Sequence, residues 1–209
     1  MPARALYCGK WINPVCFHGQ TAPDSRRMIR KVVQYGHPVL RQKGARVEAI
    51  SPGITMLIED LLETMYAAKG IGLAAQQIGE AVQVTVLDVR ALDRASSLEF
   101  NGKPADVNAF MPLVLINPEV KPLGEPVEGT EGCLSFPEVF AEIKRSELAD
   151  VVALNQKGEQ IEFRCGGLLA RAIQHEVDRL NGLLFIDRMD AQTKRELRSQ
   201  LADLQAKTD

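Results

Sequence analysis

Two adjacent residues of this 209-residue chain, His175 and Glu176, are of types that often carry out chemistry together. A His-Glu pair forms the first half of H-E-x-x-H, in which two histidines one helical turn apart bind a metal and the Glu acts as base. Arg179 fills the second histidine position. Because a guanidinium is always protonated and has no lone pair to offer, Arg179 cannot be a metal ligand.

A helix is expected to position this pair. Leu169, Ile173, Glu176 and Leu180 recur at spacings of four, three and four, so they share one helical face. Gly182 is placed to end the helix, since glycine readily adopts the left-handed conformation found just after a helix C-terminus. The pattern therefore predicts a site helix that is buried along the face carrying Glu176.

Two further stretches carry polar groups that packing alone does not require. Residues 70–79 contain a Gly-x-Gly, but they follow a predicted helix and not a strand, which excludes the dinucleotide-binding fingerprint. Glycines there let a backbone approach a ligand closely. Residues 131–135 read Glu-Gly-Cys-Leu-Ser. The candidate residues in the two stretches are Gly70, Ile71, Gly72, Gln77, Gly132, Cys133 and Leu134.

Each stretch alone has an ordinary structural interpretation, but together they resemble the three motifs of the peptide deformylases. These motifs are G-x-G-L-A-A-x-Q, E-G-C-L-S and Q-H-E-x-D-H. The first two match in full, and the third matches until its final His, where this chain has Arg179. The resemblance extends over about residues 29 to 205.

The resemblance implies an activity, which is removal of the formyl group from the N-terminal formyl-methionine of newly made bacterial or organellar proteins. It implies a metal, usually Fe2+ with Zn2+, Ni2+ or Co2+ as substitutes, bound by Cys133 and His175. Glu176 is expected to take a proton from the attacking water and deliver it to the leaving amine. The Gln77 amide and the Leu134 N–H are expected to stabilise the oxyanion. The substrate-binding residues are expected to be Gly70, Ile71, Gly72 and Gly132.

Arg179 leaves three outcomes open. Asp178 or a second water replaces the missing ligand, and a weak deformylase survives. Alternatively the metal is lost, Arg179 pairs with Glu176 or with the Cys133 thiolate, and the protein only binds peptide N-termini. In the third outcome Arg179 is a cloning, sequencing or engineered change in an active enzyme. An H-E-x-x-H metalloprotease is a further hypothesis, but it gives no role to the other two stretches.

Composition restricts the partners and the compartment. A net charge of −2 gives no bulk electrostatic reason to expect binding to DNA or to an anionic membrane. The four cysteines lack framework spacing, so a reduced setting is expected, most simply the bacterial cytoplasm, with an organelle as the alternative. Lys194, Arg195 and Arg198 could contact ribosomal RNA phosphate, although a solvated helix face explains them equally.

The remaining pattern predicts an α+β fold, with mainly antiparallel sheets packed around the site helix and a C-terminal helix. A helix is expected from Ser51-Pro52 to Gly70, and residues 1–28 are expected to be a poorly ordered or non-native extension of a catalytic domain spanning 29–209. The other expected elements are an edge strand at 29–34, a strand at 82–89, a surface loop at 91–110, a strand at 113–116 ended by Asn117-Pro118, a hairpin of 151–154 with 160–163, and a last helix at 191–206.

Overall fold

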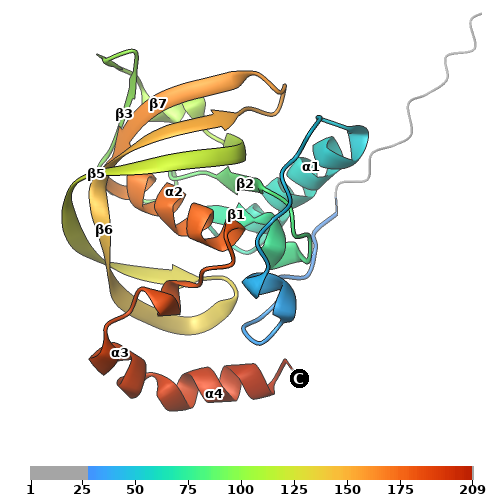
Figure 1. Cartoon of the computed structure of the whole chain (residues 1–209), viewed down its shortest axis with the longest axis vertical. Coiled ribbons are helices and arrows are strands. Elements are labelled where there is room, and N and C mark those ends of the chain that lie inside the picture. Colours follow the sequence, from blue (N-terminus) through green and yellow to red (C-terminus); the bar gives the residue numbers. More distant parts are fainter. Residues whose placement is uncertain (1–27, 209) are drawn as a thin grey trace, which may run out of the picture.

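The computed structural model describes residues 28–208, and Figure 1 shows their arrangement. The predicted extension therefore lies almost wholly outside the described residues. Met28, its last residue, is described, and its backbone N–H donates to the Asp60 carboxylate at 2.9 Å. No helix in the described part of the chain is long and apolar enough to cross a membrane.

One sheet of seven strands forms the frame, and every neighbouring pair in it is antiparallel. Its order is β1-β2-β5-β6-β7-β3-β4, so β1 lies at one edge. The prediction of a mainly antiparallel α+β fold is confirmed. The strands are β1 Gly72–Ala74, β2 Val84–Leu87, β3 Ser96–Phe100, β4 Lys103–Pro104, β5 Leu113–Cys133, β6 Phe136–Leu154 and β7 Gln160–Gly166.

The predicted site helix is α2, Gly167–Leu180, and it lies at the centre of the molecule with the curved β5–β6 ribbon around it (Figure 1). Leu169, Ile173, Glu176 and Leu180 are all buried, as their spacing predicts. Gly182 has φ 74°, which confirms it as the left-handed residue that follows the helix. The helix is thus held on several sides, and its side chains have fixed positions.

The first helix, α1, spans Pro52–Ala67 and begins as predicted. The Ser51 Oγ accepts the Ile54 N–H at 3.3 Å, which satisfies one of the free donors at the helix start. The predicted end is wrong by a few residues, since the left-handed residue after the helix is Lys69, with φ 56°, and not Gly70. Gly70 therefore lies in the connection between α1 and β1, where it lines the candidate site.

Two of the predicted segments are wrong, and the predicted end of a third is wrong. Residues 29–34 form no strand; their backbone is tied to neighbours by single hydrogen bonds, such as that from the Val33 N–H to the Gln77 carbonyl. Residues 91–110 contain β3, β4 and a 3-10 helix, Val107–Phe110, because this polar segment pairs with β7 at a sheet edge. The strand at Leu113 continues through Asn117, whose φ of 51° belongs to a register shift and not to a strand end.

The hairpin at 151–163 is confirmed, with Val151 opposite Phe163 in β6 and β7. The single C-terminal helix is corrected to two, α3 Ala191–Glu196 and α4 Arg198–Ala206, with a break at Leu197. Their leucines still pack on one apolar cluster, which includes Phe136 and Phe185. The remaining 3-10 helices are Pro38–Arg41, Ala75–Ile78 and Phe185–Asp187.

Candidate active site

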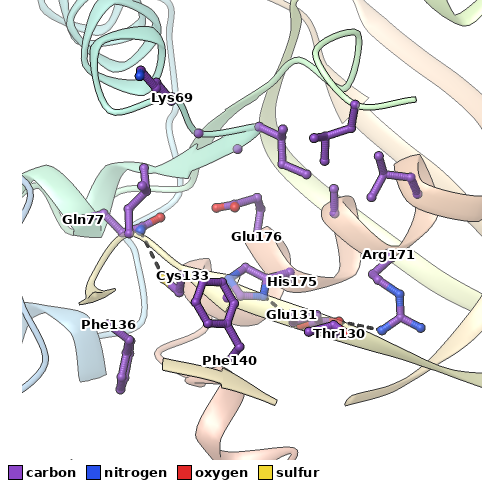
Figure 2. Close-up of a pocket in the computed structure, with 18 of the residues that line it drawn as sticks. Lys69, Gln77, Thr130, Glu131, Cys133, Phe136, Phe140, Arg171, His175 and Glu176 are labelled. Atoms are coloured by element: carbon purple, nitrogen blue, oxygen red, sulfur yellow. Dashed lines mark hydrogen bonds and ion pairs between the residues drawn. The ribbon is translucent and has the colours of Figure 1, made fainter. Parts of the chain in front are cut away.

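The three stretches singled out in the sequence meet at one open cavity of about 620 Å³. Figure 2 shows Gln77, Cys133, His175 and Glu176 around one part of it, with Arg171 farther along and Lys69 near α1. The sequence-predicted residues that line it are Gly70, Ile71, Gly72, Gln77, Gly132, Cys133, Leu134, His175 and Glu176. Arg179 is absent from this lining and lies behind the thiol.

Different elements bring these side chains together. Gln77 comes from the 3-10 helix after β1, where its Oε1 accepts the Ala74 N–H at 3.0 Å. This bond leaves its Nε2 free to point at Cys133 Sγ, 3.4 Å away, and at Ser135 Oγ, 3.3 Å away. Cys133 ends β5, so the tight connection to β6 aims its sulfur at the face of α2 that carries His175.

Gly72 is required by close approach to Glu176. A Cβ built on Gly72 would lie 2.5 Å from Glu176 Oε1, so any side chain here would displace the carboxylate. Glu176 is 5% exposed, and its Oε2 has no hydrogen-bond partner among the described residues. Burial raises the pKa of this carboxyl, although the His175 and Arg179 charges act in the opposite direction.

His175 is fixed by a carboxylate on its outer side. Glu131 Oε2 lies 2.9 Å from His175 Nδ1, and the same carboxylate takes two hydrogen bonds from Arg145 and one from Arg171. Burial alone would raise the pKa of Glu131, but the His175 and Arg145 hydrogen bonds outweigh it and lower that pKa to about 2. Glu131 is therefore a permanent anion that orients the imidazole.

Arg145 joins this carboxylate to a second one. Its Nη1 donates to Asp178, whose carboxylate also accepts Arg188 Nη2 at 2.6 Å and Nε at 3.0 Å. Asp178 is thus fully engaged on the side of α2 away from the thiol. The hypothesis that Asp178 replaces the missing metal ligand is wrong, because both its oxygens are held by arginines.

Of the two partners considered for Arg179 from the sequence, Glu176 and the Cys133 thiolate, the structure shows the thiol. Its Nη2 contacts Cys133 Sγ, and its Cζ lies 5.3 Å from the centre of the Phe136 ring. The residue is 1% exposed, and its Nε and Nη1 have no partner among the described residues. Burial alone would raise the pKa of the Cys133 thiol, but the Arg179 charge and a hydrogen bond from His175 lower it.

The same interactions act on His175 in return. Burial alone would lower its pKa, but hydrogen bonds to Cys133 and Glu131 raise it to about 9. The ring and the sulfur therefore each favour the charged form of the other, and the Arg179 charge acts on the sulfur in the same direction.

These residues do not fit a three-ligand metal site. Catalytic zinc and related sites usually supply three protein donors and leave one position open. Cys133 and His175 have suitable donor atoms, but the third position holds a guanidinium that is itself in contact with the sulfur. No group of three His, Cys, Asp or Glu side chains within residues 28–208 is arranged to hold a metal ion.

Sequence reasoning missed the supporting network of Glu131, Arg145 and Arg171. Glu131 opens the E-G-C-L-S stretch, which was a usable signal. Arg145 continues the period-two series of inward-facing residues in β6, and it is only 5% exposed. An arginine at an inward position needs a buried anion, so this alternation was a usable signal as well. Arg171 lies on α2 one turn before His175 and reaches back to the Gly129 and Ile143 carbonyls.

A thiol, an imidazole, a carboxylate and an amide around one open cavity are the groups with which an enzyme can hydrolyse an amide. The model of the polypeptide deformylase family matches residues 29–195. The chain belongs to the peptide deformylase family, whose members are metal-dependent hydrolases.

Individual relatives agree with this assignment. The chain is 42% identical to a peptide deformylase of Methylacidiphilum infernorum over 83% of this chain and 92% of that one. It is 43% identical to a peptide deformylase of Opitutus terrae over 80% of this chain and 88% of that one. The crystal structure of peptide deformylase from Thermus thermophilus superposes with a TM-score of 0.72 at 35% identity, covering 87% of this chain and all of that one.

Proposed function

We propose that this chain hydrolyses the formyl group from the N-terminal formyl-methionine of newly made proteins, releasing formate and a free amine. The observation that carries this proposal is the convergence of Gln77, Cys133, His175 and Glu176 on one cavity. The cavity is open at one side, so a peptide chain can lead away from the reacting end.

The roles of the side chains follow from their positions. Gln77 Nε2 and the Leu134 N–H are the donors for the oxygen of the formyl group as it becomes negative. Glu176, buried and with a free carboxylate oxygen, takes the proton of the attacking water and passes it to the amine. Gly70, Ile71 and Gly72 precede or enter the edge strand β1, where a substrate backbone adds as a further strand. Gly132 lines the same cavity.

The identity of a metal belongs to the same proposal. Ferrous iron is the expected ion, with zinc, nickel or cobalt as substitutes, and Cys133 and His175 are the two donors available for it. Because Arg179 occupies the third position, we assign no step of the reaction to a metal in this chain. Elemental analysis of protein purified without air, compared between the natural chain and Arg179→His, tests this; a third imidazole should raise the metal content towards one ion per chain.

The activity itself is tested by formate release from a formyl-methionyl peptide, with the acetyl-methionyl peptide as the matched control. Formate release from the first peptide and no acetate from the second is the expected result, because the proposed activity is specific for the formyl group. Absence of formate in both the presence and the absence of added ferrous iron would contradict the proposal.

The contact of Arg179 with Cys133 supports a second candidate, a homologue that binds peptide N-termini without turnover. Calorimetry with formyl-methionyl and free methionyl peptides separates the two candidates. Binding of either peptide without formate release favours the second candidate, and formate release excludes it.

We also propose a bacterial cytoplasmic setting, which the bacterial sources of the relatives support. Contact with the ribosome is proposed through the exposed basic residues Lys194, Arg195 and Arg198 at the junction of α3 and α4. Co-sedimentation with ribosomes at increasing salt, compared with a variant in which the three are replaced by Gln, tests this contact.

A further inference from the structure

Phe140 is a large apolar side chain at an outward-facing position of β6. In this part of the strand Val139 and Ala141 are buried while Glu142 and Lys144 are exposed, so the two faces alternate in the usual way. Phe140 belongs to the outward series, whose next two members are charged, and it is 64% exposed. A single exposed apolar residue is ordinary on a protein surface, so the question is where this ring lies.

The ring lies at the cavity, against the backbone of Gly132. Phe140 and Gly132 are opposite each other in the β5–β6 ladder, and both line the cavity (Figure 2 draws Phe140 with Cys133 and His175). A Cβ built on Gly132 would lie 2.7 Å from Phe140 Cε1, so only a glycine lets the ring lie this close to β5. Because Gly132 directly precedes Cys133, the ring is held next to the reacting part of the cavity.

Leu92 adds a second exposed apolar side chain to the same cavity. It comes from the connection between β2 and β3, it is 43% exposed, and it is part of the lining. The partly buried Ile71 and Leu134 line the cavity as well. Exposed apolar side chains that gather around a cavity mark a surface that a ligand covers. The cavity therefore offers apolar contacts in addition to its polar reacting groups.

We propose that Phe140 is a specificity-determining residue that selects formyl-methionyl chains in which the next one or two side chains are apolar. This inference rests on the proposed function, because it names the class of peptide that the site accepts. The formyl group has to lie near Gln77 and Cys133, and the peptide leaves past Gly72 and Gly132, the two glycines of the cavity wall. A side chain that follows the methionine then meets the ring of Phe140, and the contact removes apolar area of both from water.

The ring has a further effect, which is to cover Gly132. An aromatic side chain opposite a glycine shields the bare backbone of that pair and supports the local strand pairing. Cover alone would make Phe140→Ala less stable, but it would leave the relative rates with two different peptides unchanged. A ratio of rates measured on one protein sample therefore separates the two roles, because the amount of folded protein cancels.

The test measures kcat/KM of the full chain, purified without air, with two pairs of peptides. The first pair is formyl-Met-Leu-Ala and formyl-Met-Asn-Ala, and the second is formyl-Met-Ala-Leu and formyl-Met-Ala-Asn. Leu and Asn are similar in size and uncharged, so the charged lining residues Lys69, Arg94 and Glu138 do not bias the comparison.

The natural chain should prefer Leu to Asn in at least one pair by roughly three- to tenfold, the effect of partly burying a leucine side chain. Phe140→Ala should reduce this preference to less than about twofold, since most of the apolar contact is lost. Phe140→Tyr keeps the ring and should retain the preference. A preference that is equal in the Phe, Ala and Tyr versions would remove Phe140 from substrate selection.

Phe110→Ala is the matched control, because it makes the same change at an exposed phenylalanine outside the cavity lining. Phe110 is 42% exposed, and its ring centroid lies 4.6 Å from that of Phe100. This variant should lose some stability and keep the natural preference between the peptides. A fall in preference as large as that of Phe140→Ala would assign the effect to a general loss of stability and overturn the inference.

The outcomes separate this inference from the proposed function. Formate release with a Leu preference that Phe140→Ala removes supports both, and formate release without any preference overturns only the inference. Calorimetry with the same peptides gives the ratio of their dissociation constants, which needs no turnover. A Leu preference in binding that depends on Phe140, without formate release, overturns the activity and keeps the selectivity. Neither formate release nor a preference in binding overturns both.

Discussion

Arg145 and Arg179 are both buried against α2, yet their surroundings differ in kind. Each of the three Arg145 side-chain nitrogens donates to a carboxylate, on Glu131 or Asp178. Arg179 contacts a single sulfur, and two of its nitrogens have no partner in the described part of the chain. The first arrangement fixes a helix and an imidazole; the second leaves charge available beside a cavity. The arginine whose hydrogen bonds are all satisfied supports the fold, and the arginine with unsatisfied nitrogens lies at the candidate active site.

Glu176→Gln tests the incompletely paired side and should have the largest effect. Loss of the proton acceptor should reduce formate release about 10²- to 10⁴-fold. The free energy of unfolding should stay constant or rise, because a neutral amide replaces a buried carboxylate that lacks a partner. Steady-state formate release and urea denaturation measure the two quantities, and a parallel fall of both would contradict the distinction between the two regions.

Arg145→Leu removes the arginine whose side-chain nitrogens all donate to carboxylates. It leaves the Glu131 and Asp178 carboxylates buried without their shared cation, so the free energy of unfolding should fall by roughly 3–5 kcal/mol. Urea denaturation at neutral pH measures the change. Arg164→Leu, which removes an exposed arginine from its Asp150 partner, is the matched control and should change stability very little. A cost for Arg145→Leu as small as the control's would mean that the network does not support the fold.

Gly72→Ala probes the position of Glu176 without removing it. The added Cβ falls 2.5 Å from Oε1, so the carboxylate must move while the flexible side chain absorbs the clash. A displacement of this size should cost about a hundredfold in formate release, with less than about 1 kcal/mol lost in stability. Gly53→Ala, in an open position on α1, is the control. Unchanged turnover in Gly72→Ala would show that Glu176 tolerates other positions.

Arg179→Met tests stability on the incompletely paired side. The thiol can take up a proton when the guanidinium is removed, so no buried charge is stranded, and Met fills similar space against Phe136. The free energy of unfolding should therefore change by less than about 1 kcal/mol. Urea denaturation beside Arg145→Leu gives the direct contrast, and a loss matching that of Arg145→Leu would place Arg179 in the structural frame.

The smallest effect is expected at the pair formed by the exposed Arg90 and the buried Asp88. The Arg90 hydrogen bond lowers the pKa of Asp88, against the effect of burial, and Tyr66 donates to the same carboxylate at 2.8 Å. Because the folded pKa lies below the unfolded value of about 3.9, the stabilisation is present above that pH and is lost as the pH falls through the folded pKa. Asp88→Asn should cost less than about 1 kcal/mol at neutral pH, and the difference should shrink in urea titrations carried out below about pH 3. A constant difference would show that the charge of Asp88 is not its source.

The sequence predicted those parts of the fold in which local chemistry decides the structure. Ser51-Pro52 started α1 because capping and a preset φ act within one turn. Residues 91–110 were predicted wrongly because β3 depends on a partner strand, β7, more than sixty residues away. Asn117-Pro118 looks like a strand end, and only the long pairing of β5 with β6 carries the strand past it.

The sequence predicted which residues form the candidate site but not the hydrogen bonds and ion pairs between them. Motif order was enough to bring Gln77, Cys133 and His175 together, and the cavity lining agrees. Motif order could not say whether the long Arg179 side chain would turn to Glu176 or to Cys133, since both lie within its reach on or beside α2. Nor could it reveal Arg145, whose inward position follows from the alternation along β6 and not from any motif.

The described contacts of the Arg179 side chain are with Cys133 and Phe136, so the carboxylate network that holds α2 does not include position 179. One base separates some arginine codons from histidine codons. Descent by a single nucleotide substitution can therefore exchange a guanidinium for an imidazole in an otherwise unaltered protein.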